Sequence, residues 1–462
     1  MGLVSLARKN SQRYVNKIAF IDGGKYISFN KFYADILKAI TILKKYGIAP
    51  GDRFTILAEN CVEIITFLFA AAGIGSIMVP LNFRLARQEL LYIIRNCSPL
   101  LFFYHEPTKH MAISLKEEVV MLRQIEEWRD EPGVTYRDHF FKQFVSTGPC
   151  LLIYSSGSTG YPKGCQLSEQ NLVANAVNLA FEAGINDRDI YLSFAPLFHV
   201  AGLNLILATF LAGATTVILP RFNPEAVAES IVREKATFTF FITPTLRRFV
   251  NAPAIKREHL KSLRLVFGPG GKEPPEVLRA AFNLLSPKFL GIYGQTEAAG
   301  VVSLSTEQIE LEKPGSCGQL LPLYAGRIVD EEGWDLPDGA NGELILKGPG
   351  VFQGYWNDVA QTEKTLVNGW LHTGDIFRRD EMGNLYLVDR KKYLIKTGGE
   401  NVYPKEVEKV LLEHPLIADA AVVGVPDEQW GEAVKAFLVV REGAQKPAFS
   451  EIEQWVKERI AG

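Results

Sequence analysis

Cysteine is scarce in this sequence, and its few cysteines form no recognisable motif. Five occur among 462 residues, at positions 61, 97, 150, 165 and 317, with no C-x-x-C pair. An odd number of scattered cysteines argues against a zinc site and against a disulfide framework. The pattern is typical of a reducing compartment, so we expect a cytoplasmic protein.

An excess of charge of one sign is missing as well. Lysine and arginine together number 50, and aspartate and glutamate number 52, which gives a net charge of −2. Such a balanced chain exerts no long-range attraction on nucleic acid or on an anionic membrane. We therefore expect no nucleic-acid partner, and any site for an anion has to be built locally.

Long uninterrupted apolar runs are also lacking in the sequence. The segments 64–81 and 203–219 approach the length of a membrane span, but glycine interrupts each of them. A spanning helix needs about 20 continuous apolar residues, so each segment instead predicts a buried helix followed by a buried strand. We expect no transmembrane segment, and the N-terminus lacks the apolar core of a signal peptide.

Helical and strand patterns alternate through the first 300 residues. Asn30–Tyr46 has apolar residues at helical spacing, Asp52–Ala58 predicts a strand and Val62–Ala72 predicts a helix. This rhythm favours an α/β fold with parallel sheets and helices on both faces. From about residue 315 to 389 the pattern changes to short strands and turns, which predicts a small antiparallel β-barrel or sheet. From residue 391 onward helices return, in a separate small α+β domain.

A strand that leads into a loop of small residues is the most informative segment. Residues 151–164 have the sequence LLIYSSGSTGYPKG. The glycines let backbone N–H groups point into one concavity, and the hydroxyls and the lysine add donors and positive charge. The lysine follows a proline and precedes a glycine, so the loop is not a Walker A motif. A solvated turn is the alternative, but such a dense cluster after a buried strand indicates a phosphate site. The proposed phosphate ligands are Ser155, Ser156, Gly157, Ser158, Thr159, Gly160 and Lys163.

This loop resembles the phosphate loop of the adenylate-forming superfamily, which includes acyl-CoA synthetases, firefly luciferases and the adenylation domains of peptide synthetases. The resemblance implies an ATP-dependent acid–CoA ligase that forms an acyl-AMP, releases pyrophosphate and transfers the acyl group to coenzyme A. It also implies Mg²⁺ as a cofactor and a small carboxylic acid as substrate. Further matching segments are GIYGQTE at 291–297, WLHTGD at 370–375, DRKKYLIKTGGEN at 389–401 and FHVAG at 198–202.

The GIYGQTE and FHVAG segments carry roles in nucleotide and acid binding through this resemblance. They imply that Tyr293 stacks on adenine, that Thr296 touches the α-phosphate and that Glu297 binds Mg²⁺, a cation that keeps several waters beside one carboxylate. His199 would face the acyl carboxylate and the phosphates, although a packed core histidine is the alternative. The other residues assigned to ATP are Gly294, Gln295, Gly270 and Gly271. The last two belong to the segment GPGGKE, which departs from the family's usual GGAPL, so the contacts of this segment with the nucleotide and the acid remain open.

The segments at 370–375 and 389–401 imply residues that bind ribose, a hinge between domains, and residues that contact CoA. Asp375 would accept both ribose hydroxyls, since a carboxylate has two acceptor oxygens, and Arg390 would assist it. Lys392 would be the hinge, and Lys396 would reach the phosphates in one domain orientation, whereas Lys391 is expected to be a solvated linker residue. Gly398 and Gly399 would line the CoA tunnel. The residues expected to take part in catalysis are Lys163, His199, Thr296, Glu297 and Lys396.

The resemblance also implies a domain plan. A large domain at 1–390 would contain two βα-type parallel-sheet subdomains and the small barrel, and a mobile α+β domain would occupy 391–462. The family's C-terminal domain continues into a Pro-x-x-x-x-Gly-Lys segment, whose lysine bridges the carboxylate and the α-phosphate. No candidate for that lysine precedes Gly462, so we expect a C-terminal domain without its usual end, either truncated or a natural short form, and weak adenylation.

The substrate and two alternative functions remain open at this point. Segments 203–210, 243–249 and 300–302 would line an apolar acyl pocket, which favours an aliphatic or aromatic acid. Arg247 and Arg248 could meet a second carboxylate, but helical spacing places them on a wet helix face. A non-catalytic nucleotide-binding relative and a luciferase-like enzyme are the alternatives, and a homodimer is possible. A dehydrogenase is disfavoured because no G-x-G-x-x-G motif follows an early strand.

Overall fold

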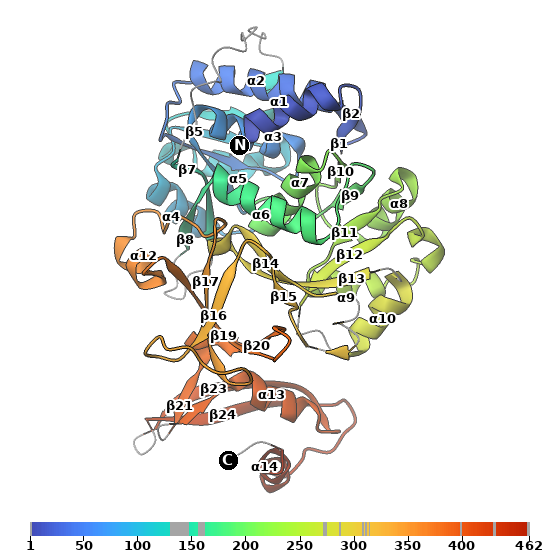
Figure 1. The fold of residues 1–462 in the computed structure, drawn as a ribbon, viewed down its shortest axis with the longest axis vertical. Coiled ribbons are helices and arrows are strands. Elements are labelled where there is room, and N and C mark those ends of the chain that lie inside the picture. Colours follow the sequence, from blue (N-terminus) through green and yellow to red (C-terminus); the bar gives the residue numbers. More distant parts are fainter. Residues whose placement is uncertain are drawn as a thin grey trace. The chain divides into compact units, whose positions relative to one another are not determined.

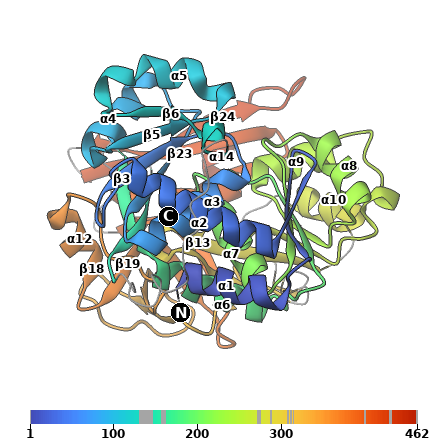
Figure 2. The same ribbon diagram turned by 90° about the horizontal axis from the view of Figure 1, so that it is seen from above.

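The computed structural model describes residues 2–129, 147–155, 162–270, 275–285, 288–306, 309, 312–313, 315–397, 400–427 and 431–459. The chain forms two compact units. One contains residues 1–325 and 346–371, and the other contains residues 326–345 and 372–462. Figure 1 colours the chain along its sequence and labels its elements, and Figure 2 shows the same ribbon from above.

A six-stranded sheet in the first unit has the order β6-β5-β3-β4-β7-β8, and only β8 runs antiparallel to its neighbour. The helix α3 joins β3 to the parallel strand β4. It is apolar on every side and buried along almost its whole length, which confirms the predicted buried helix and strand at 64–81. The strands are β3 (Arg53–Leu57), β4 (Ile77–Leu81), β5 (Leu101–Tyr104), β6 (Leu122–Gln124), β7 (Pro149–Ser155) and β8 (Lys163–Ser168).

A nine-stranded sheet in the same unit has the order β15-β14-β13-β12-β11-β9-β10-β1-β2. Its six central strands are parallel, whereas β2, β14 and β15 are antiparallel at its two edges. The predicted α/β fold with parallel sheets is therefore confirmed. The strands are β1 (Ile18–Asp22), β2 (Lys25–Ser28), β9 (Ile190–Ser193), β10 (Thr215–Ile218), β11 (Phe238–Phe240), β12 (Leu265–Pro269), β13 (Lys288–Gln295), β14 (Gly300–Leu304) and β15 (Gln319–Leu320).

Local capping decides where several helices of this unit begin. Ser28 accepts a hydrogen bond from the Lys31 N–H at the start of α2, and Ser168 and Asn171 cap α6 reciprocally. In the view of Figure 1, α6 and α7 lie beside the nine-stranded sheet, and α7 contacts β9, β10 and β14. The helices are α1 (Leu3–Arg13), α2 (Phe29–Lys45), α3 (Val62–Ile74), α4 (Arg87–Cys97), α5 (Lys109–Ser114), α6 (Glu169–Glu182), α7 (Val200–Leu211), α8 (Pro224–Glu234), α9 (Thr243–Val250), α10 (Pro275–Leu285) and α12 (Val359–Thr365).

Two small antiparallel sheets follow toward the C-terminus, in agreement with the short strands predicted there. A five-stranded sheet contains β16 to β20, and a four-stranded sheet has the order β22-β21-β24-β23. The second sheet packs with α13 and α14 around a small core that contains Ile395, Leu411 and Ile417. The elements are β16 (Ala325–Val329), β17 (Asn341–Lys347), β18 (Leu366–Val367), β19 (Trp370–Arg379), β20 (Leu385–Arg390), β21 (Ile395–Thr397), β22 (Glu400–Val402), α13 (Pro404–Leu412), β23 (Ile417–Asp427), β24 (Gly431–Val440) and α14 (Phe449–Lys457).

All five cysteines are buried and carry free thiols. Among the helices that the structure describes, none combines the length and the apolar character that crossing a bilayer requires.

Candidate active site

The proposed phosphate loop connects two paired strands. β7 and β8 are antiparallel, and Ser155 and Lys163 are the last partners of this hairpin, so the two ends of the loop lie side by side. The assigned residues within the loop, which are Ser156, Gly157, Ser158, Thr159 and Gly160, lie outside the described residues. The hairpin therefore positions the lysine at the base of the loop.

Tyr355 connects this hairpin to the proposed magnesium ligand. The chain around Tyr355 pairs with the free edge of β8, because the Trp356 N–H donates to the Gly164 carbonyl oxygen at 2.8 Å. The Tyr355 hydroxyl donates to Oε1 of Glu297 at 2.8 Å, and the Lys163 ammonium lies 5.6 Å from the centre of its ring. Burial and the nearby Glu297 raise the pKa of Tyr355, so the phenol remains a donor. Sequence reasoning missed Tyr355, because a single aromatic residue after a glycine is too weak a signal.

Glu297 is held through its backbone as well as its side chain. It lies in the short 3₁₀ helix η6 (Thr296–Ala298), directly after β13. Its carbonyl oxygen accepts a hydrogen bond from the Phe352 N–H at 2.8 Å. The chain then turns back into β14 through Ala299 and Gly300, which both have positive φ. The structure thus brings Glu297, Tyr355 and Lys163 together, while the buried Tyr293 and its neighbours Gly294 and Gln295 lie on the strand that leads to this turn.

The residues around Glu297 fit a magnesium ion in their chemistry. Mg²⁺ prefers one or two carboxylates together with phosphate oxygens and water. Tyr355 engages one carboxylate oxygen of Glu297, and a carboxylate offers a second oxygen for a metal. Cys165 is also close to Glu297. Its burial and the charge of Glu297 raise the pKa of its thiol, so it does not become a thiolate that could bind the metal.

His199 is placed directly before the first residue of α7, and the residue is partly accessible to solvent, while its ring packs against that of Phe198. The turn before it is tight, because a Cβ atom at Gly202 would lie 2.6 Å from the Pro196 carbonyl oxygen, which explains the glycine of the FHVAG segment. The pKa of His199 lies below its ordinary value, since surrounding protein atoms displace water from the ring and Arg84 is positively charged. We therefore expect a neutral imidazole at pH 7.

Gly270 lies against β13, where its N–H donates to the Ile292 carbonyl oxygen at 2.9 Å. A Cβ atom at this position would lie 3.0 Å from the same oxygen, so a larger residue would press on the strand that carries Tyr293. Gly271 lies outside the described residues.

In the second unit, the two residues assigned to ribose are direct neighbours. Asp375 on β19 and Arg390 on β20 are cross-strand partners, and Nε of the arginine lies 3.2 Å from Oδ1 of the aspartate. The aspartate is buried, whereas the arginine side chain is largely exposed. A carboxylate has two acceptor oxygens, which suits the two hydroxyls of a vicinal diol.

Glu343 organises the turn that precedes Asp375. Its carboxylate accepts a hydrogen bond from the Gly374 N–H at 3.0 Å, and its Oε2 lies 3.1 Å from Nδ1 of His372. The Lys391 ammonium donates to the same carboxylate at 2.9 Å, so this lysine, which is exposed as the sequence suggested, also forms an ion pair. Burial alone would raise the pKa of Glu343, but the hydrogen bonds from Lys391 and His372 outweigh it and hold the pKa below its ordinary value.

Replacing Glu343 with glutamine is expected to lower the stability of the folded protein at pH 7 by about 1.5 kcal/mol, because charged hydrogen bonds become neutral ones. A carboxylate with a lowered pKa stabilises the fold fully above its ordinary pKa and loses this effect as the pH falls through the lower value. Thermal unfolding of both proteins from pH 7 to pH 3.5 should therefore show a difference that shrinks in acid. A difference that stays constant over this range would contradict the prediction.

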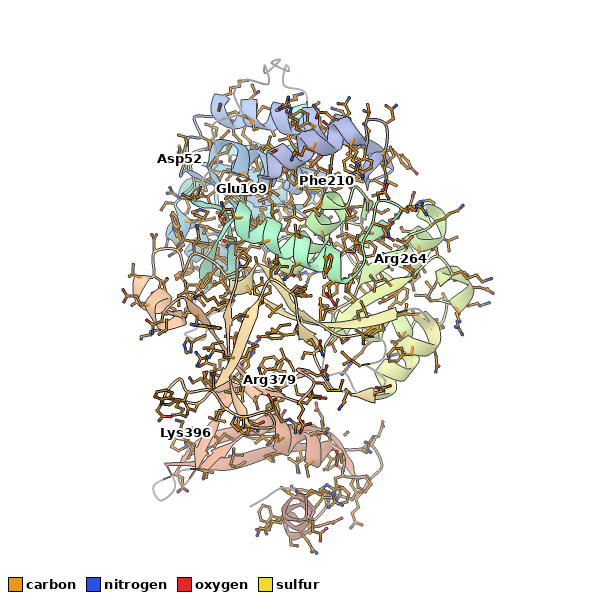
Figure 3. All side chains as sticks on the ribbon, in the orientation of Figure 1. Asp52, Glu169, Phe210, Arg264, Arg379 and Lys396 are labelled. Atoms are coloured by element: carbon orange, nitrogen blue, oxygen red, sulfur yellow. The ribbon has the colours of Figure 1, made fainter. Side chains whose placement is uncertain are left out.

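Lys396 forms an ion pair within the second unit. Its ammonium donates to Oε1 of Glu331 at 2.8 Å, and its backbone N–H donates to Glu432 (Lys396 is labelled in Figure 3). The Lys392 ammonium lies over the ring of its neighbour Tyr393. Gly398 and Gly399, assigned to CoA, lie outside the described residues.

A lysine at the base of a small-residue loop, with a carboxylate held beside it through a buried tyrosine, suits the binding of a nucleoside triphosphate and a metal. Beside parallel α/β sheets, this arrangement agrees with the resemblance to adenylate-forming enzymes. The chain belongs to the family of AMP-binding enzymes, which matches residues 7–356, and residues 406–462 match the C-terminal domain of AMP-binding enzymes.

Relatives that are named for an activity indicate which kind of AMP-binding enzyme this chain is. The chain is 33% identical to a feruloyl-CoA synthase of Amycolatopsis over all of this chain and 93% of that protein. It is 33% identical to an indoleacetate–CoA ligase of Aromatoleum aromaticum over 94% of this chain and 87% of that protein. It superposes on the o-succinylbenzoate CoA synthetase of Bacillus subtilis in complex with its acyl-adenylate, with a TM-score of 0.86, 29% identity, and coverage of 99% of this chain and 92% of that one.

These relatives are acid–CoA ligases, and this chain is likewise an AMP-forming acid–CoA ligase with ATP and coenzyme A as co-substrates. The activity expected from the sequence is thereby confirmed. A luciferase-like enzyme or a non-catalytic relative is not favoured.

Proposed function

We propose that this ligase activates an aromatic carboxylic acid in a magnesium-dependent reaction. The observation that carries the proposal is the link from Lys163 through Tyr355 to Glu297, which supplies positive charge and a metal ligand at one place. The substrate class is supported by the relatives named for feruloyl, indoleacetate and succinylbenzoate groups.

A second carboxylate on the substrate is not part of the proposal. Arg247 and Arg248 lie on the exposed face of α9, whereas Leu246 and Phe249 of the same helix are buried. The Arg248 guanidinium instead lies 5.2 Å from the centre of the Phe222 ring. These two cations therefore provide no argument for a dicarboxylate.

The proposed roles of the remaining residues follow the family resemblance. The residues from Ser155 to Lys163 would bind the triphosphate, and Thr296 would contact the α-phosphate. Glu297 would hold Mg²⁺, which when bound neutralises charge on the phosphate oxygens. The other proposed contacts are Tyr293 with adenine, Asp375 and Arg390 with ribose, Lys396 with phosphate, Gly398 and Gly399 with CoA, and Lys392 as the hinge of a small domain at 391–462.

The chemistry needs positive potential more than a protein nucleophile. In the first step a carboxylate oxygen of the acid attacks the α-phosphorus, and pyrophosphate leaves. In the second step the thiolate of coenzyme A attacks the acyl carbon, and AMP leaves. Lys163, Thr296 and neutral His199 would act as preorganised donors where charge accumulates.

The proposal predicts acid-dependent release of pyrophosphate and formation of a CoA thioester by the purified chain with ATP and Mg²⁺. We expect aromatic acids such as cinnamate and phenylacetate to exceed hexanoate by about tenfold in kcat/KM, because an aromatic ring buries more apolar area. Coupled detection of pyrophosphate and chromatography of the thioester are suitable measurements. Equal rates for both acid types would refute the substrate class, and the absence of acid-dependent pyrophosphate release would refute the function.

A further inference from the structure

Three asparagines form one face of α6. Asn171, Asn175 and Asn178 follow each other at intervals of four and three residues, which places their side chains on the same side of the helix. All three are buried. Reciprocal capping with Ser168 accounts for Asn171 in the first turn. Asparagine is a poor residue for the interior of a helix, so local helix preference does not explain Asn175 and Asn178. The explanation has to come from what the side chains contact.

Asn175 clamps the turn that carries Glu297. Its Nδ2 lies within hydrogen-bonding distance of three acceptors, the carbonyl oxygens of Ala298 at 3.0 Å and Val301 at 2.8 Å and the hydroxyl of Tyr324 at 2.8 Å, which share its two N–H groups. The Tyr324 hydroxyl in turn donates to the Ala298 carbonyl oxygen at 2.7 Å. One amide therefore holds both ends of the turn, within one peptide unit of the proposed metal ligand.

Asn171 clamps the second segment that reaches Glu297. Its Nδ2 donates to the carbonyl oxygens of Pro349 and Val351, both at 2.8 Å. The next residue, Phe352, donates its N–H to the carbonyl oxygen of Glu297. The same segment continues to Tyr355, which binds the Glu297 carboxylate. Two neighbouring amides of α6 thus hold both segments that fix Glu297.

The hydrogen bonds of Asn175 with the turn all come from its side-chain NH₂ group. Within the part of the chain that the structure describes, Oδ1 of Asn175 has no hydrogen-bond partner. A Cβ atom on Gly300 would lie 3.3 Å from this oxygen and 3.0 Å from Cγ of Asn204, so the turn lies tightly against α6 and α7. Ala299 adopts a φ of +55°, a conformation that costs energy outside glycine and persists only when its surroundings impose it.

We propose that Asn175 is a positioning residue for the adenylation step, which holds the Thr296–Gly300 turn so that Glu297 binds Mg²⁺ in the productive geometry. The inference rests on the proposed function, because it assumes that Glu297 is the metal ligand. Mg²⁺ requires nearly ideal octahedral geometry. A carboxylate displaced by a fraction of an ångström therefore binds the metal less well and misplaces the phosphates.

The test compares Asn175→Ala and Tyr324→Phe with the wild-type chain in acid-dependent pyrophosphate release over a Mg²⁺ titration, and in calorimetric binding of Mg²⁺–ATP without acid, which should weaken in the same order. A misplacement of about 1 Å costs up to about 100-fold in rate, so we expect Asn175→Ala to lower kcat by about 10- to 100-fold and to raise the Mg²⁺ concentration for half-maximal activity. Tyr324→Phe removes only the supporting hydroxyl and leaves the ring in place, so a smaller change in the same direction is expected.

Asn10→Ala is the matched control. Asn10 on α1 is buried, and its Nδ2 donates to the carbonyl oxygen of Phe210 (labelled in Figure 3) at 2.6 Å, so the variant also loses a buried amide–carbonyl bond. We expect it to lower the thermal midpoint while kcat and the Mg²⁺ requirement stay within about twofold of wild type, since a lost hydrogen bond affects stability by itself.

Unchanged kcat and Mg²⁺ dependence in Asn175→Ala, assayed below its thermal midpoint, would overturn the inference. So would a kinetic loss of the same size in Asn10→Ala. If Asn175→Ala does not fold, an unaltered Mg²⁺ titration of Tyr324→Phe would overturn it. A wild-type chain that releases no pyrophosphate would instead refute the proposed function, so the two failures are distinguishable.

Discussion

Replacing Glu297 with glutamine should lower the rate of acid-dependent pyrophosphate release by about 10²- to 10³-fold, the range for the loss of one preorganised electrostatic contact in an active site. Glutamine keeps an oxygen that can accept the hydrogen bond of Tyr355, so the packing of the turn is preserved. What disappears is the negative charge that Mg²⁺ requires. The measurement is a pyrophosphate assay at saturating acid over a range of Mg²⁺ concentrations.

Two further variants separate the charge from its surroundings. Glu229→Gln removes an exposed carboxylate on α8 and should leave the rate unchanged. Tyr355→Phe removes the donor but keeps the Glu297 charge, so its loss should be smaller, about three- to tenfold, as for one neutral hydrogen bond. A Glu297→Gln enzyme with wild-type rate and Mg²⁺ dependence would show that the metal is held elsewhere.

Replacing Gly294 with alanine should produce a large loss of stability for a single added methyl group. A Cβ atom at this position would lie 2.1 Å from the Gly300 carbonyl oxygen and 3.0 Å from Cα of Val301. Both atoms belong to the backbone of the paired strand β14, so no side-chain rotation can relieve the contact. Overpacking of this kind costs about 3 kcal/mol, which corresponds to a thermal midpoint lowered by roughly 5 °C or more.

Gly383→Ala is a suitable control for this substitution. Gly383 has a φ of +83°, and an added Cβ atom would meet nothing within 4 Å, so only the backbone conformation is penalised. The expected cost is about 1 kcal/mol. Circular dichroism melts of both variants would test the difference, and equal midpoints would contradict the predicted clash between β13 and β14.

Motifs and strong periodicity accounted for much of this molecule in advance. The helix predicted at 30–46 is α2 (Phe29–Lys45), which apolar spacing and a serine cap specify locally, and the strand predicted at 52–58 is β3 (Arg53–Leu57). The proximity of Lys163 and Glu297 followed from the family resemblance. β8 was not predicted, because KGCQLS has no strand periodicity and becomes a strand by pairing on both of its edges.

The residues that hold the site in place could not be predicted. Asn175, Glu343 and Tyr355 act through contacts with residues that lie 29 to 149 positions away in the sequence. In sequence they are one asparagine in a helix, one glutamate in a strand and one aromatic residue after a glycine. Their roles depend on which carbonyl oxygens and carboxylates the fold brings to them, and a single sequence does not contain that information.

The burial of every cysteine has a consequence for an enzyme that handles a free thiol. Coenzyme A readily forms mixed disulfides with protein thiols, and such exchange requires a thiolate that solvent can reach. Here all five sulfurs are buried, and burial raises the pKa of Cys97 to about 12 and lifts the pKa of Cys61, Cys150 and Cys165 above the ordinary range. We therefore expect that the folded chain binds coenzyme A repeatedly without forming a mixed disulfide with it, and that oxidised coenzyme A does not react with these five cysteines.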